Sequence, residues 1–321
     1  MTKCTLCVIL LLTLPAFATI TDVQSNAKWT CSGSGSSIIC TVTLAQTTNH
    51  NLLAVWTFWQ STFPYTASVG DSNPLNAFPS AVGPTLQSVS NTSAQIFYAA
   101  NIHPSSGGDT VTVTFACPST NPACTSPTIT SGGVVAVEYS GLDQNYPLDS
   151  VSAGYSTSGN ATSLLDSGTV APANSNLLVF GGGTTDTGTA SALSPPWTTI
   201  QNHSGSVTEQ MIVTGNNALQ RATASSTSTG NWVMQMAVFR DAYWTVAGGW
   251  RPARVGKLLY ADQFPGGDIG GQINTAITQL PTVGGVPAGV VSLEGYSGIV
   301  TLSTPIVLNS HFVSLVGPGR E

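Results

Sequence analysis

Two short segments rich in Asp and Asn are the strongest candidates for chemistry in this sequence. One is Asp71-Ser-Asn73, and the other runs from Gly141 to Asp149 and contains Asp143. Such side chains supply the oxygen ligands that Ca²⁺ takes in proteins, and a pair of carboxylates can also cleave a glycosidic bond. Asp and Asn stabilise turns through their own backbone as well, and this interpretation is favoured for both segments. Ca²⁺ is the only cofactor that the sequence indicates, and its weak candidate ligands are Asp71, Asn73, Asp143 and Asp149.

No residue is predicted to be catalytic. A Ser–His–acid triad would need His50, His103, His203 or His311, and none of these accompanies a G-x-S-x-G segment. The glycine clusters at 181–183 and 266–267 lack the lysine of a phosphate-binding loop, so they are interpreted as turns.

Aromatic residues alternate along the segment Trp56-Thr-Phe58-Trp59. In a strand, Trp56 and Phe58 share one face while Trp59 points to the other. A buried core is the favoured place for Trp56 and Phe58, because aromatic rings bury large apolar areas. Trp59 is left as a weak candidate for stacking on a sugar ring.

The first residues are typical of a secretory signal peptide. Lys3 precedes a short apolar run, and Ala16-Phe-Ala18 resembles a cleavage site, so residues 1–18 are expected to be removed. The later sequence offers no apolar stretch long enough for a membrane span. The sequence therefore predicts a secreted, extracellular protein.

Four cysteines remain after the predicted signal, Cys31, Cys40, Cys117 and Cys124. An exported chain is expected to oxidise them, and the short loops favour local pairing, 31 with 40 and 117 with 124. Each such bond contributes about 2–3 kcal/mol in the chain-entropy model. A four-cysteine metal site is disfavoured, because the sequence has no C-x-x-C pair.

Charged residues are rare. They make up 7% of the chain, against roughly 25% in an ordinary soluble domain, and the net charge is −6. This balance argues against nucleic acid as a partner, which would select for a basic patch. Hydroxyl and amide side chains take the place of charges, as suits an extracellular β-protein.

Residues 19–241 are predicted to form an antiparallel β-sandwich, either jelly-roll or immunoglobulin-like. Short runs rich in Val, Ile, Thr and aromatic residues alternate with Gly, Pro, Asn and Ser, and no helical pattern interrupts them. Three pairs of segments also indicate an internal duplication in the same order: 51–55 with 176–180, 95–101 with 210–216, and 134–139 with 233–239.

The pattern changes after residue 241. Residues 242–257 combine Gly, Pro and basic residues and are expected to be a linker. Beyond them, Asp268 is a good N-cap for a helix with apolar residues at 269, 273, 276, 277 and 280. Short apolar runs follow at 290–293, 306–308 and 312–316, separated by Gly and Asn.

Residues 258–319 resemble the opening of a right-handed parallel β-helix of the pectate-lyase superfamily. The resemblance rests on Gly267-Asp268 before the helix, Gly289-Val-Val-Ser-Leu-Glu-Gly-Tyr296 and Val313-Ser-Leu-Val-Gly-Pro-Gly319. It implies a capping helix and a first coil over 258–321. A solenoid needs several stacked coils, so the sequence is expected to be a fragment of a longer protein.

The resemblance implies a secreted protein that acts on or binds extracellular polysaccharide, with the sandwich as an accessory module. An adhesive or structural β-helix protein without catalytic activity is the alternative, because fold alone does not settle function. Whether the parent protein is a lyase or glycoside hydrolase stays open. The fragment itself is expected to be inactive, since the coils that carry the family's catalytic residues are missing. Polysaccharide or cell-surface glycan is the expected partner.

Overall fold

The computed structural model describes residues 19–321 with several gaps. Outside it lie residues 1–18, 118–120, 122–123, 158–161, 194–195, 216–217, 243–244, 247–248, 251–257, 262–267, 281, 284–285, 288, 293–303, 305, 307–312 and 317–321. The predicted signal peptide falls wholly outside the described residues.

The described part of residues 19–242 consists of strands and turns, with no helix. The strands of the first half are β1 (Thr21–Lys28), β2 (Gly33–Ser34), β3 (Ser37–Leu44), β4 (Leu52–Gln60), β5 (Thr66–Gly70), β6 (Ser80–Gln87), β7 (Thr92–Ala99), β8 (Asp109–Ala116), β9 (Thr128–Ile129) and β10 (Ser131–Ser140). Those of the second half are β11 (Leu148–Tyr155), β12 (Thr162–Asp166), β13 (Leu177–Thr185), β14 (Ala190–Ala192), β15 (Thr198–His203), β16 (Ser206–Val213), β17 (Thr223–Gly230) and β18 (Trp232–Arg240). The prediction of a mainly β chain is confirmed.

The two halves have the same topology. In the first, a five-stranded sheet has the order β1-β10-β4-β7-β6 and a three-stranded sheet the order β3-β8-β5. In the second, the corresponding orders are β11-β18-β13-β16-β15 and β12-β17-β14, and every pairing within these four sheets is antiparallel. Even an irregularity in the first strand recurs, at 22–24 and at 148–150. The predicted duplication is confirmed, and the halves are called the first and second repeat below.

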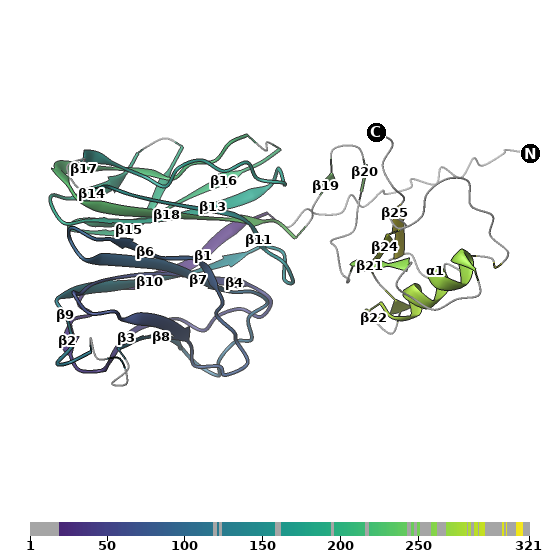
Figure 1. The fold of residues 1–321 in the computed structure, drawn as a ribbon, viewed down its shortest axis with the longest axis horizontal. Coiled ribbons are helices and arrows are strands. Elements are labelled where there is room, and N and C mark those ends of the chain that lie inside the picture. Colours follow the sequence, from purple (N-terminus) through teal and green to yellow (C-terminus); the bar gives the residue numbers. More distant parts are fainter. Residues whose placement is uncertain are drawn as a thin grey trace, which may run out of the picture.

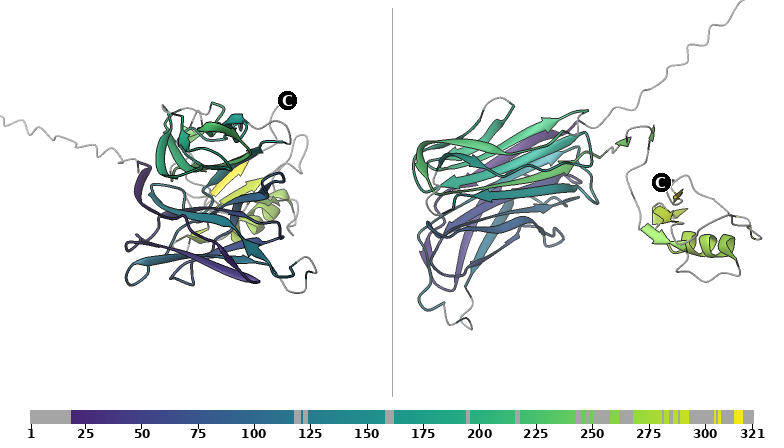
Figure 2. Two further views of the ribbon diagram at one scale, coloured as in Figure 1. Left: turned by 90° about the vertical axis from the view of Figure 1, so that its left-hand side faces the viewer. Right: turned by 45° about the horizontal axis from the view of Figure 1, so that its top comes forward.

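The four sheets lie in layers, as Figure 1 and Figure 2 show. One apolar cluster fills the space between the two sheets of the first repeat, and another does the same in the second repeat. A third cluster lies between the two five-stranded sheets and joins the repeats. The five-stranded sheets are therefore covered on both faces.

The sequence of each strand reflects whether one or both of its faces are buried between layers. In β3, which belongs to an outer layer, exposed and buried residues alternate along the whole strand. In β4, β13 and β18 the side chains of both faces are buried, so these strands are nearly continuous apolar runs. The three strands come from the segments that gave the clearest sequence similarity between the halves.

The sequence similarity identified the right strands but placed β4 and β13 one residue out of register. It aligned Leu52 with Leu177. Leu52 contributes to the cluster between the repeats, whereas Leu177 packs inside the second repeat, and Leu178 is the residue that faces the first. A slip of one residue moves a strand side chain to the opposite face, and runs of Leu and Val match equally well at neighbouring registers.

The central strands of the two repeats meet at Trp56 and Gly182. These residues occupy corresponding places, four positions after Leu52 and four after Leu178. The Trp56 side chain is fully buried, and a Cβ atom added at Gly182 would overlap its indole ring. The Trp56 ring of the first repeat therefore fits only because the equivalent residue of the second repeat, Gly182, has no side chain.

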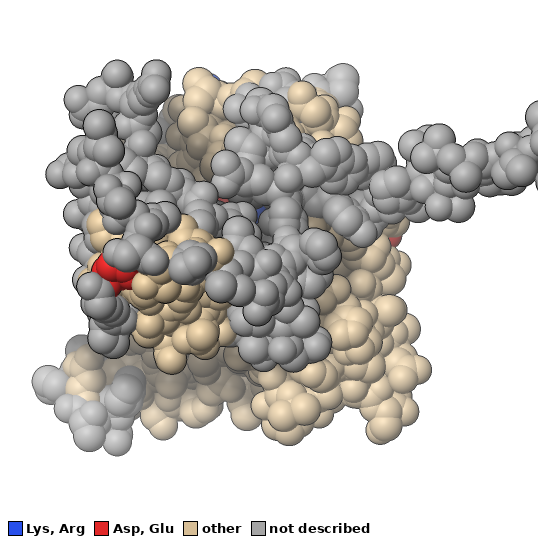
Figure 3. Space-filling model, turned by 90° about the vertical axis from the view of Figure 1, so that its right-hand side faces the viewer, with Lys and Arg blue, Asp and Glu red and all other residues tan. Residues whose placement is uncertain are grey.

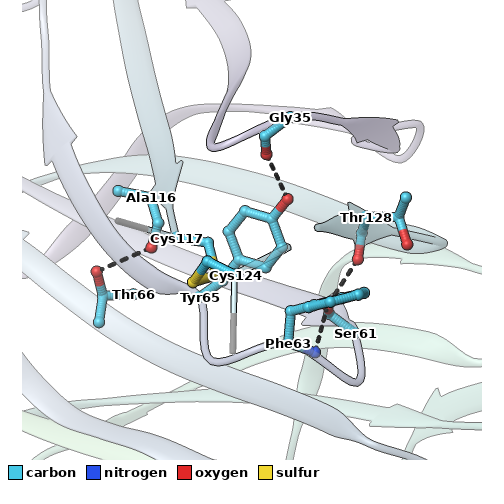
Figure 4. The surroundings of a disulfide bond; sticks show 9 residues. All are labelled: Gly35, Ser61, Phe63, Tyr65, Thr66, Ala116, Cys117, Cys124 and Thr128. Carbon is cyan, nitrogen blue, oxygen red and sulfur yellow. Dashed lines mark hydrogen bonds between the residues drawn. A yellow bond between two sulfur atoms is a disulfide. The ribbon is translucent and has the colours of Figure 1, made fainter. Parts of the chain in front are cut away.

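Both predicted disulfides are present. The Cα atoms of Cys31 and Cys40 are 5.5 Å apart, and those of Cys117 and Cys124 are 5.7 Å apart. Figure 4 shows the second bond beside Tyr65, whose hydroxyl donates to the carbonyl of Gly35 at 2.6 Å. The two crosslinks thus secure the outer layer of the first repeat, and the second repeat has no cysteine.

The C-terminal residues form a separate cluster of elements. They are β19 (Thr245–Val246), β20 (Gly249–Trp250), β21 (Leu258–Tyr260), α1 (Ile269–Thr278), β22 (Thr282–Val283), β23 (Val286–Pro287), β24 (Gly289–Ser292) and β25 (Val313–Val316). β19 and β20 pair within the predicted linker, so a short antiparallel ribbon lies there. Strands β21, β24 and β25 pair in parallel.

The predicted helix and its cap are confirmed. A carboxylate oxygen of Asp268 accepts from the N–H of Gly271 at 2.9 Å, and the other accepts from the N–H of Thr304 at 2.7 Å. The apolar face of α1 packs on Val291 of β24 and on Ala261. The expected strand at 306–308 falls mostly outside the described residues, although Ile306 packs against this cluster.

We predict that Gly182→Ala destabilises the protein by about 1–3 kcal/mol, because the new methyl group has to displace the Trp56 ring from a closely packed core. Gly70→Ala is the matched control, since Gly70 also lies in a strand and a Cβ there would meet no atom within 4 Å. Urea unfolding of the two variants measures the difference. Equal stability of the two variants would contradict the contact described above.

Candidate ligand-binding pocket between the repeats

A pocket of about 330 Å³ opens where the two repeats meet. It is called the junction pocket. The first repeat contributes the side chains of Trp29, Phe58, Gln60, Thr92 and Ser131, and the second repeat contributes residues 184–188 and 203–206. Its walls thus come from the end of β4, the starts of β7 and β10, and two turns of the second repeat. Neither repeat makes the pocket alone.

Aromatic rings form one wall. The half-buried ring of Trp29 stacks on His203 of the other repeat, with ring centroids 5.7 Å apart and planes 16° from parallel. Gly133 makes room for these rings, because a Cβ there would lie 2.7 Å from the Phe58 ring and 3.0 Å from the Trp29 ring. The positions of the Trp29 and Phe58 rings therefore depend on the absence of a side chain at Gly133 of β10.

Ser and Thr residues and one Asp make up much of the remaining lining. The Thr184 and Ser206 hydroxyls pair at 2.9 Å, and the Thr185 hydroxyl is buried without a hydrogen-bond partner in the described part of the chain. Asp186 accepts from the backbone N–H and the side-chain amide of Asn231, each at 2.8 Å. These bonds fix the turn after β13 and hold the Asp186 carboxylate against Asn231.

The duplication creates a second junction, and that one is closed. There the β6–β7 turn of the first repeat lies beside the end of β11 in the second. Gln87 is 1% exposed, and its amide donates to the carbonyl of Ser156 at 3.0 Å and to the side chain of Asn231 at 3.3 Å. We call it the sealed junction.

Turn length explains the difference between the junctions. Residues 88–91 join β6 to β7, so this hairpin is long enough to place Gln87 against the second repeat. Only Ser204 and Gly205 join β15 to β16. The shorter hairpin leaves the space of the junction pocket unfilled.

Cations are scarce around the pocket. Lys28, Arg221 and Arg240 are the only basic residues between 19 and 242, where ten acidic residues lie. Arg221 pairs with Asp166 and lowers the pKa of that carboxyl, and Arg240 pairs with Asp143. Charged side chains are also sparse elsewhere, since few of the described residues on the face drawn in Figure 3, the right-hand side of Figure 1, are charged. Asp186 is the one Asp or Glu among the described residues of the pocket lining, which include no Lys or Arg.

Trp59 does not occupy the surface position that was predicted for it. Its side chain is 2% exposed and packs on Phe115 in the core of the first repeat, with ring centroids 5.4 Å apart. A ring without an exposed face cannot stack on a sugar, so this prediction is wrong. The physical reason is that both faces of β4 are covered, one by each neighbouring layer.

The Asp71 and Asn73 side chains hold a turn. One oxygen of Asp71 accepts from the N–H of Asn73 at 2.9 Å, and the other accepts from the Asn76 amide at 2.7 Å. The side-chain oxygen of Asn73 accepts from the N–H of Leu75 at 3.1 Å. Burial raises the pKa of Asp71, against the effect of these bonds, and the charge of Asp109 raises it further.

The carboxylates of Asp143 and Asp149 have different hydrogen-bond partners. Asp143 accepts from the N–H groups of Asn145 and Tyr146, at 2.9 and 3.1 Å, and pairs with Arg240. Asp149 accepts from the N–H of Ala173 at 3.0 Å and from the Asn174 amide. Within the described ranges, no three His, Cys, Asp or Glu residues gather as they would around a metal ion.

The histidines fall in different surroundings. His50 contacts Asn49 and Asn101 through its two ring nitrogens, at 2.9 and 2.7 Å. The backbone of His103 bonds with Asn76, and His311 lies outside the described residues. His203 alone belongs to the junction pocket.

Sequence reasoning missed Trp29 as a pocket residue and treated His203 as a turn residue. Trp29 lies just before Cys31, and His203 lies in the second repeat, so no local pattern connects them. The duplication was the one available signal, because it implies that equivalent turns of the two repeats meet.

Comparison of the chain with protein-family models, with characterised proteins and with solved structures gives no match. No helix among the described residues is long and apolar enough to cross a bilayer.

A buried carboxyl group lies elsewhere in the second repeat. Glu209 of β16 is fully buried, and neither of its oxygens makes a hydrogen bond of normal geometry with a described residue. It fits because Gly181 has no side chain, since a Cβ there would lie 2.9 Å from Cγ of Glu209. Desolvation raises the pKa of Glu209 to about 8, and the backbone of Thr223 opposes this only in part.

This carboxyl group makes stability depend on pH. In unfolded chains Glu loses its proton near pH 4.5, whereas in the folded protein Glu209 keeps it up to about pH 8. The free energy of unfolding therefore falls as the pH rises through this window, by a few kcal/mol at about 1.4 kcal/mol per pKa unit.

We predict that Glu209→Gln removes this part of the pH dependence and raises the stability at pH 9 relative to the unchanged protein. Urea unfolding of both proteins at pH 5, 7 and 9 measures it, and the other titrating groups are common to the two. An equal fall in stability for both proteins between pH 5 and pH 9 would show that Glu209 is not protonated in the fold.

Proposed function

We propose that this chain belongs to a secreted protein that acts on or binds extracellular polysaccharide, and that the two repeats are its glycan-binding module. The observation that carries the proposal is the junction pocket, whose lining combines a stacked Trp–His pair with several Ser and Thr residues. Sugars present apolar ring faces and many hydroxyl groups. A site for them needs an aromatic surface and side chains that both donate and accept hydrogen bonds, as hydroxyls do.

The proposal includes a finer description of the fold. Each repeat is a five-plus-three sandwich of the jelly-roll kind, because the chain crosses between its two sheets at most connections instead of forming successive hairpins. In the C-terminal part, three parallel strands and a capped helix are consistent with the first coil of a parallel β-helix. The resemblance to the pectate-lyase superfamily stays a prediction for that part.

Two features support an extracellular location. Disulfides persist in oxidising compartments, and both pairs are formed in the first repeat. Residues 1–18 also have the pattern of an export signal.

The test is the binding of the chain without its predicted signal, residues 19–321, to soluble polysaccharides. Affinity electrophoresis in gels that contain hydroxyethylcellulose, xylan, galactomannan or pectin of high methyl ester content compares the variants. We expect retardation in at least one gel, and we expect Trp29→Ala to weaken that binding tenfold or more, about 1.4 kcal/mol.

Tyr155→Ala is the matched control. Counted from the matching irregularities of β1 and β11, Tyr155 takes in the second repeat the place of Trp29 in the first. It is 50% exposed and does not line the junction pocket. The proposal fails if no polysaccharide retards the protein, or if both variants weaken binding equally.

A further inference from the structure

We infer that the junction pocket selects uncharged glycans and excludes polyuronates, the polysaccharides that carry a carboxylate on most of their sugars. This inference rests on the proposed function and names its substrate class. Three observations support it: the described lining contains no Lys or Arg, the Asp186 carboxylate is held in place by Asn231, and the other polar groups of the lining are uncharged.

The described lining offers a carboxylate no cation to pair with. Its polar groups are the Gln60 amide, the His203 ring, several Ser and Thr hydroxyls and the Asp186 carboxylate, and no Lys or Arg is among the described residues that line it. Bringing an anion out of water costs free energy, and no cation here offsets that cost. The hydroxyls of an uncharged sugar can be matched by the same lining, since each can donate or accept.

Asp186 acts directly against an anionic ligand. Asn231 donates two hydrogen bonds to it, one from its backbone and one from its side chain, so this carboxylate of the pocket lining is held in place. A carboxylate has about four lone-pair sites, so it can still accept from a sugar hydroxyl. A second carboxylate beside it would meet a like charge, which is unfavourable.

The rest of the module adds a weaker repulsion. Two of its three basic residues are paired with Asp side chains. The third, Lys28, immediately precedes Trp29, and successive side chains of a strand point to opposite faces. An acidic polymer therefore approaches a surface with an excess of negative charge, an effect that salt reduces.

The experiment compares polymers that share a backbone and differ in charge. Hydroxyethylcellulose is paired with carboxymethylcellulose, and highly methyl-esterified pectin with polygalacturonate. We expect residues 19–321 to bind the uncharged member of a pair at least tenfold more tightly. Trp29→Ala should weaken the binding tenfold or more, and 0.5 M NaCl should leave it nearly unchanged.

Asp186→Asn tests the role of the pocket. This variant should bind the anionic member several-fold more tightly than the unchanged protein does. Asp149→Asn is the matched control, because Asp149 is also held by a backbone N–H and an Asn side chain, at the start of β11 and outside the pocket lining. It removes the same charge and should leave the preference unchanged.

The outcomes separate the two proposals. Tight, Trp29-dependent binding of the anionic member overturns the charge selection and leaves the glycan-binding module standing. Equal effects of Asp186→Asn and Asp149→Asn also overturn it, because net charge would then account for the preference. Failure to bind any of the four polymers, or those of the earlier panel, overturns the proposed function itself.

Discussion

The architecture of residues 19–242 depends on the contact between Trp56 and Gly182. The indole ring lies between the two five-stranded sheets, next to Phe58 at a centroid distance of 5.3 Å, and is completely buried. Its Nε1 has no hydrogen-bond partner among the described residues, which is unfavourable by itself. Burial of so large a ring outweighs that loss. Because this contact sets how the repeats pack, it also sets the distance between the residues that the two repeats contribute to the junction pocket.

The same contact shows how a duplicated sequence became asymmetric. In a symmetric pair, each residue meets its own counterpart near the axis. Two Trp residues there would collide, and two Gly residues would leave a void that lowers stability. One large and one absent side chain avoid both problems. The flanking turns of the two repeats differ as well. The longer one places Gln87 in the sealed junction, and the shorter one leaves the pocket beside Trp29.

Features formed by residues close together in the sequence were predicted correctly, whereas features that depend on contacts between distant segments were not. Cys31 and Cys40 lie on two arms of one turn, and Asp268 caps the helix that directly follows it, so spacing alone was sufficient. Trp59 was misjudged because alternation tells which residues share a face, but not whether another sheet covers that face. Leu52 was aligned with the wrong leucine for a related reason, since register depends on pairing partners from elsewhere in the chain.

The buried carboxyl groups of the sheets illustrate why the Asp186 carboxylate influences which ligand the pocket binds. Glu138 is as buried as Glu209, but its oxygens accept from the Thr48 N–H, the Asn51 amide and the Gln24 amide, at 2.6–2.7 Å. A buried carboxyl group is thus accommodated here where donors surround it. A surface built of hydroxyls and amides, with few ions of either sign, offers a ligand few charges to pair with. In such a surface the Asp186 carboxylate has more influence on which glycan enters than it would among many Lys and Glu side chains.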